Sequence, residues 1–97
     1  MIEIHQDTWT IKSELTFETV PLIYKKFKKN LTNITKYWKI NFENCNKIDS
    51  AGLSLIVQYI KHAQSHNIKL ELDSISKSAI SLAKVHGAES ILKKYII

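Results

Sequence analysis

The feature that most constrains the fold is a strand, a helix and a second strand that follow one another in the middle of the sequence. Residues 37–42, "YWKINF", alternate between apolar and polar side chains, as a strand with one buried face does. Residues 50–65 carry apolar side chains at helical spacing, and residues 68–72, "IKLEL", alternate again. Two strands joined through a helix pair in parallel by a right-handed crossover. The sequence therefore predicts an α/β fold.

The remaining segments extend this unit at both ends. In chain order we expect two strands of a hairpin and three further helices, over residues 2–5, 8–15, about 19–31, about 76–86 and about 88–95. Ser76 and Gly87 suit the start and the end of the third helix of the chain. Because alternate strand residues are polar, one face of the sheet should be exposed to solvent. The predicted architecture is a mixed four-stranded sheet with helices mainly on one face, in a single domain over residues 1–97.

Composition and charge argue against several functional classes. No apolar run approaches the roughly 20 residues that cross a bilayer, and the first residues lack the pattern of a secretory signal. We therefore expect a cytoplasmic protein that does not insert directly into a membrane. The net charge is +5, but all 14 basic residues are lysines, and the arginine fork that reads bases is absent. We therefore expect no nucleic-acid partner.

The sequence contains no recognisable catalytic or metal-binding motif. There is no glycine-rich phosphate loop, no G-x-S-x-G and no H-E-x-x-H. His62 and His66 could chelate a metal from one helical face, but no third ligand stands at a suitable spacing, so we interpret them as an exposed pair near a helix end. Ser50 lacks an identifiable base, and Cys45 is interpreted as a small packed residue. We predict no catalysis, no cofactor and no metal site.

The candidate site is the junction "NKIDSAGLSL", residues 46–55. Asp49 or Ser50 can cap the helix that follows, whereas Gly52 costs about 1 kcal/mol relative to alanine and suggests close approach of another backbone. A core stripe of Leu53, Ile56, Val57, Ile60 and Ala63 leaves the outward side to Ala51, Ser54, Leu55, Gln58 and His62, with Tyr59 at its margin. An exposed Leu55 beside Ser50 favours a protein-docking surface. Its predicted residues are Asp49, Ser50, Ala51, Gly52, Ser54, Leu55 and Gln58.

The "DSAGL" junction and the order of elements resemble the STAS domain family, the fold of anti-sigma-factor antagonists and of the cytosolic tails of sulfate transporters. Residues 13–21, "SELTFETVP", and 74–92, "SISKSAISLAKVHGAESIL", are similar to the MlaB branch. Its members are small subunits attached to the ATPase of the Mla phospholipid ABC transporter of Gram-negative bacteria. The chain departs from that branch at Ser13, where glycine is common.

The resemblance implies a function centred on the hydroxyl residue after the aspartate, which is Ser50. MlaB-like proteins use this position to contact the ATPase. Our leading expectation is a non-catalytic subunit, peripheral to the inner membrane through a complex with ATPase, permease and substrate-binding subunits, that supports intermembrane phospholipid trafficking and outer-membrane lipid asymmetry. The alternative is an anti-sigma-factor antagonist regulated by phosphorylation of Ser50. Lipid or nucleotide binding by the domain itself has no pocket signature in the sequence.

Overall fold

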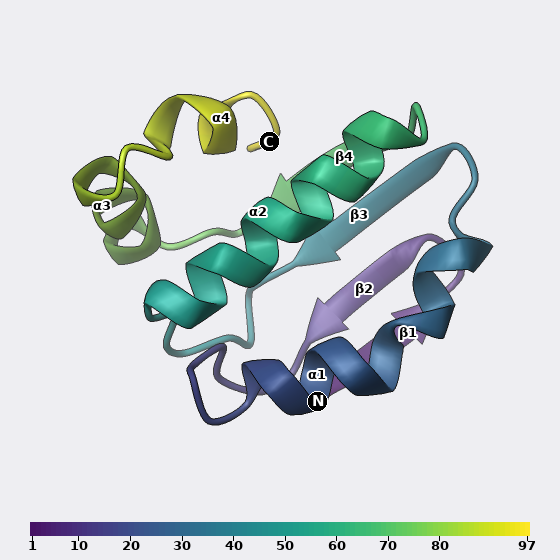
Figure 1. Cartoon of the computed structure of the whole chain (residues 1–97), viewed down its shortest axis with the longest axis horizontal. Helices are drawn as coiled ribbons and strands as arrows, with labels where there is room; N and C mark the ends of the chain where they lie inside the picture. Colours follow the sequence, from purple (N-terminus) through teal and green to yellow (C-terminus); the bar gives the residue numbers. More distant parts are fainter.

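The computed structural model describes residues 1–97 and contains one mixed sheet whose strands lie in the order β1-β2-β3-β4. The strands are β1 (Ile2–His5), β2 (Thr8–Ile11), β3 (Tyr37–Asn41) and β4 (Lys69–Asp73). The helices are α1 (Val20–Phe27), the 3-10 helix η1 (Lys29–Asn33), α2 (Ser50–Ser65), α3 (Lys77–Val85) and α4 (Glu89–Lys93). β1 pairs antiparallel with β2, and the other two pairings are parallel. The predicted fold class is confirmed, and Figure 1 shows α1 and α2 in front of the sheet.

One face of the sheet forms the core. Its buried side chains, which alternate with polar ones along β2, β3 and β4, are Trp9, Ile11, Trp38, Ile40, Leu70 and Leu72. The Trp9 ring meets Trp38 edge-on with 5.0 Å between ring centroids, and Tyr59 of α2 lies 5.7 Å from Trp9. The aromatic cluster therefore fixes α2 against the centre of the sheet, because edge-to-face rings and buried area both stabilise this contact.

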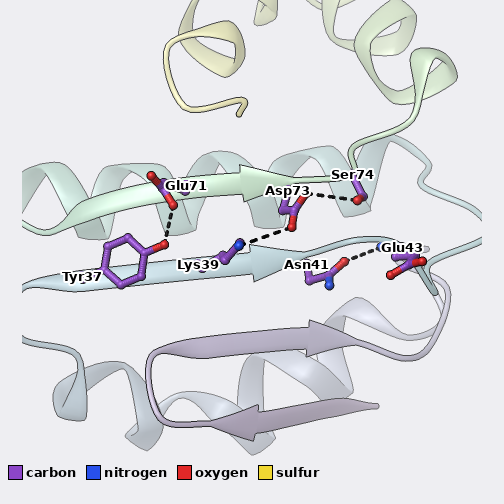
Figure 2. A network of polar contacts seen from close by, with 7 residues as sticks. All are labelled: Tyr37, Lys39, Asn41, Glu43, Glu71, Asp73 and Ser74. Carbon is purple, nitrogen blue, oxygen red and sulfur yellow. Dashed lines mark hydrogen bonds and ion pairs between the residues drawn. The ribbon is translucent and has the colours of Figure 1, made fainter.

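The opposite face of the sheet is polar and carries no helix (Figure 2). The Tyr37 hydroxyl donates to the Glu71 carboxylate, and Lys39 Nζ lies 3.6 Å from Asp73 Oδ2. Both contacts join β3 to β4, and all four side chains are half-buried. Polar side chains that pair across neighbouring strands need no covering layer, which explains why the helices can gather on one side.

The first helix is shorter than the sequence predicts. We expected one helix over residues 19–31, but α1 ends at Phe27 and η1 follows. The Thr32 hydroxyl donates to the Lys29 carbonyl at 2.7 Å, a local bond that competes with regular helix. Tyr24 is 46% exposed, and only Ile23 and Phe27 of this helix are buried.

The helices in the second half of the chain begin and end close to the predicted cap residues. α2 begins at Ser50 and ends at Ser65, as expected. Ser76 Oγ accepts from the Ala79 amide at 3.1 Å at the start of α3, and Gly87 adopts φ +72° after its end. The chain then returns to β4, where the Leu72 amide donates to the Tyr95 carbonyl at 2.7 Å. None of the helices combines the length and the apolar character that crossing a membrane requires.

Candidate partner-binding site

Asp49 forms the structural cap at the start of α2. Its Oδ1 accepts from the Gly52 amide at 3.0 Å, and its Oδ2 accepts from the Phe17 amide at 2.9 Å. Burial alone would raise the pKa of Asp49, but the amides of Gly52, Phe17 and Ala51 outweigh it and hold the pKa below its usual value. One carboxylate therefore caps α2 and ties the segment of residues 13–19 to it.

Ser50 is the first residue of α2, and its hydroxyl takes no part in the cap. The side chain is exposed, and its Oγ lies 3.2 Å from Nε2 of His86, the residue that ends α3. No local sequence pattern indicated this pairing, since the two residues are 36 positions apart. Ser50 is thus free of any role in helix capping while it stands where two helices meet.

Gly52 is explained by contact within the chain. A Cβ built at this position would lie 2.2 Å from the Leu15 carbonyl oxygen, closer than real Cβ atoms come. That carbonyl also accepts from the Asp49 amide at 3.1 Å. The close backbone approach that we predicted is therefore made by Leu15 of the same chain, and Gly52 itself is buried.

The predicted exposure of Leu55 is also wrong, since Leu55 is only 3% exposed. Gly52, Leu55 and Tyr59 lie on one side of α2 at spacings of three and four residues, and all three are buried. Leu15 covers this side of α2 at Gly52, the rings of Trp9 and Trp38 cover it at Tyr59, and α1 packs beside the same helix. The predicted stripe was rotated too far towards Val57, which is only half-buried.

Of the other predicted site residues on α2, Ser54 and Gln58 are exposed and Ala51 is half-buried. A groove of ≈ 380 Å³ runs beside them between α2 and the α3–α4 turn. It is lined by Ser50, Leu53, Ser54, Val57, Gln58, Lys61, His86 and Ala88. The polar part of the predicted surface is therefore accessible and continues into a groove that contains His86.

Two exposed apolar side chains, which were not among the predicted site residues, belong to residues that contact this junction through the backbone or directly precede a residue that contacts it. Phe17 is 70% exposed, and its amide is held by Asp49. Val85 is 80% exposed and directly precedes His86. Phe17 fits no strand alternation or helical stripe, which is the one sequence signal that could have identified it. We call Phe17, Ser50, Ser54, Val85 and His86 the Ser50 surface; its mixture of aromatic, aliphatic and hydroxyl groups suits protein docking.

The histidine pair at the other end of α2 is not the exposed pair that we expected. His62 is half-buried, with Nε2 3.3 Å from the Leu31 carbonyl oxygen, and its ring stacks on that of His66 at 4.2 Å. Burial lowers the pKa of His62, and the neighbouring His66 lowers it further. No group of three potential metal ligands occurs in the structure. Cys45 is half-buried against the core, and burial raises the pKa of its thiol.

Comparison with known proteins identifies relatives of this fold. Three similar solved structures are a protein assigned as an anti-sigma factor antagonist from Thermotoga maritima, and the anti-sigma factor antagonist SpoIIAA in its unphosphorylated form and, as a Bacillus cell fate determinant, in its phosphorylated form. Their TM-scores are 0.73, 0.73 and 0.71, at 21%, 16% and 17% identity. The matches cover 94%, 100% and 100% of this chain and 80%, 84% and 87% of those chains.

A search of curated protein sequences finds no match. The family model of the STAS domain, in contrast, matches residues 1–95, almost the whole chain. Together with the mixed sheet, the one-sided helix layer and the Asp49–Ser50 junction, this match establishes the family. The chain belongs to the STAS domain family.

Proposed function

We propose that the chain is a non-catalytic binding module that acts as an anti-sigma factor antagonist and is switched by phosphorylation of Ser50. The observation that carries this proposal is the division of labour at the start of α2. Asp49 makes the cap, and the neighbouring hydroxyl stays exposed. A side chain that can be modified without loss of the helix start is what a reversible switch requires.

The switch acts through charge. A kinase would transfer the γ-phosphoryl group of ATP to Ser50: the bond from Oγ to phosphorus forms, the bond from phosphorus to the β–γ bridging oxygen breaks, ADP leaves and the hydroxyl proton passes to a base. The product adds about −1.5 to −2 charges beside the Asp49 carboxylate. A partner that docks on the neutral hydroxyl and on Phe17 would then face two adjacent anions, so binding weakens.

Two further facts support this choice. The similar solved structures include one antagonist described in both an unphosphorylated and a phosphorylated form. An exposed Leu55 was one of the observations in favour of docking on a transporter ATPase, and Leu55 is buried.

The ATPase subunit of a phospholipid ABC transporter is the second candidate partner. It is favoured by the MlaB-like stretch of residues 13–21, in which Phe17 is 70% exposed next to the Ser50 junction. An aromatic anchor beside a small hydroxyl residue is a suitable centre for a constitutive interface. In this alternative the chain would support the ATPase of a complex at the inner membrane, with no modification of Ser50.

The test compares wild type with Ser50→Glu and Ser50→Arg in cells of the source organism. We expect the wild type to co-purify with an anti-sigma kinase, and intact-mass and peptide analysis to find a phosphate on Ser50 in part of the protein. Both variants should lose the kinase. Ser65→Glu is the matched control, because Ser65 is exposed at the far end of the same helix, about 22 Å from Ser50.

The outcomes separate the two candidates. The antagonist function would be rejected if wild type recovered a transporter ATPase, Ser50→Arg lost that ATPase and no phosphorylated form were found. The chain would then be assigned as a partner of the transporter ATPase. Undiminished binding of every partner by both Ser50 variants would overturn the assignment of the surface itself.

A further inference from the structure

Ser50 and His86 form a contact between two helices at the mouth of a groove. The hydroxyl oxygen and Nε2 are 3.2 Å apart, both side chains are exposed, and both line the ≈ 380 Å³ groove beside α2. No acidic residue lines this groove, and its two basic residues are Lys61 and His86. No acidic side chain on the groove side would therefore repel a negative charge attached to Ser50.

The start of α2 cannot itself receive such a charge. Asp49 already accepts from the Gly52 and Phe17 amides, at 3.0 and 2.9 Å. Its ionised carboxylate also repels a second anion at the same place, which opposes the usual attraction of a helix start for phosphate. A phosphate on Ser50 must turn away from Asp49 and find its partners among side chains.

His86 is the side chain within reach. It ends α3, and the following turn is fixed by Gly87 at φ +72° and by the Ala88 amide, which donates to the Ala83 carbonyl at 2.7 Å. An imidazolium at a helix C-terminus is favoured by the helix dipole. Lys61 lies 11 residues beyond Ser50 on α2, about 16 Å along the axis, too far for direct contact with the same phosphate.

None of the other charged side chains on the neighbouring elements contacts Ser50 in the structure. On α4, the Glu89 carboxylate is engaged by Lys93 at 3.2 Å. On α3, Lys84 is exposed to solvent. In the loop before α2, the positive charge of Lys47 helps to lower the pKa of Asp49. Asp49 is the one carboxylate next to Ser50 in the chain.

We propose that His86 is the receiver of a phosphate on Ser50, forming an ion pair that joins the end of α3 to the start of α2. The inference deepens the proposed function, since it concerns the regulation of the same site. The unmodified state has one hydroxyl–imidazole contact, which a partner can displace. The phosphorylated state has a charge-assisted hydrogen bond, which is shorter and stronger, and which fixes His86 at the entrance of the groove.

The test installs phosphoserine at position 50 by genetic encoding, so that no kinase is needed. The second ionisation of the phosphate is followed by ³¹P NMR from pH 4.5 to 8.5 in the otherwise wild-type chain and with His86→Asn and His86→Gln. A cationic neighbour favours the dianion, so we expect the midpoint of the His86 chain to lie lower by about half a pH unit or more. Phosphorylation should also raise Tm more when His86 is present.

The control places phosphoserine at position 65, where His86 substitutions should not move the midpoint. Equal midpoints at position 50 in all three chains would overturn the receiver role. The result is independent of the cellular partner: a clear midpoint difference without phosphorylation in cells would support the His86 contact while rejecting the antagonist function. Phosphorylation of Ser50 in cells together with equal midpoints would support the antagonist function and reject the His86 contact.

Discussion

Replacement of Gly52 by alanine should destabilise the domain although alanine is the better helix former. The new Cβ would lie 2.2 Å from the Leu15 carbonyl oxygen, and Leu15 Cβ and its carbonyl carbon would be 2.8 and 2.9 Å away. Two of these three atoms are backbone, so no side-chain rotation removes the clash. Leu15 or α2 must move by about 1 Å, a degree of overpacking that costs about 1–3 kcal/mol.

That movement also strains two backbone hydrogen bonds. The Leu15 carbonyl accepts from the Asp49 amide at 3.1 Å, and the Leu15 amide donates to the Lys47 carbonyl at 2.8 Å. Each is worth about 1 kcal/mol, whereas the gain in helix propensity is also about 1 kcal/mol. We expect a net loss of about 2 kcal/mol in the free energy of unfolding, or roughly 8–16 °C in Tm.

Urea denaturation followed by circular dichroism measures this change, with Ser54→Ala as the control. Ser54 is exposed two positions further along the same helix, so alanine there should change stability by only a few tenths of a kcal/mol, in the favourable direction. If Gly52→Ala were as stable as wild type or more so, the reasoning from the Leu15 contact would be refuted, and Gly52 would again need a functional explanation.

Two pH-dependent predictions follow from the caps and from the histidine pair. Asp49→Asn should cost about 1 kcal/mol near neutral pH, because an asparagine side chain has one acceptor oxygen and cannot accept from both the Gly52 and the Phe17 amide. Since the folded pKa of Asp49 is lowered, this difference should persist above about pH 3.9 and shrink as the pH falls through the folded value. Urea midpoints that differ equally at all pH values would contradict this prediction. His62 has a lowered folded pKa, so the stability that its neutral ring supplies is present above about pH 6.5 and lost as the pH falls below that value. Wild type should therefore lose more stability than His62→Gln between pH 8 and 5, and parallel stability curves would show that His62 is not the cause.

The sequence was sufficient to predict the sheet because one face of the sheet packs against the core and the other face is polar. Residues 37–42 and 68–72 alternate strictly, and the structure gives them one buried and one polar face. α2 has the predicted bounds because Asp49 supplies a strong local cap. Both signals are local, and local signals can be read from a chain without its partners in space.

The site depended on contacts that no local pattern contains. Leu55 and Val57 are both apolar, and the tertiary packing around α2, which includes Leu15 at Gly52 and the neighbouring α1, decides which of them is buried. The meeting of Ser50 and His86 requires the α3–α4 unit to return beside α2, 36 residues later. Family resemblance indicated Ser50 as the functional position, but the neighbours of Ser50 came only from the tertiary structure.

The uncovered face of the sheet offers a way to hold this domain while its binding is measured. Lys69 is exposed in β4 and lies on the same face as Tyr37, its partner in the register, whereas the Ser50 surface belongs to the helix layer and the loop of residues 13–19. A fluorophore or a biosensor linker placed at Lys69 would be separated from the Ser50 surface by the sheet itself. An immobilised chain would then present Ser50, Phe17 and His86 to a soluble partner.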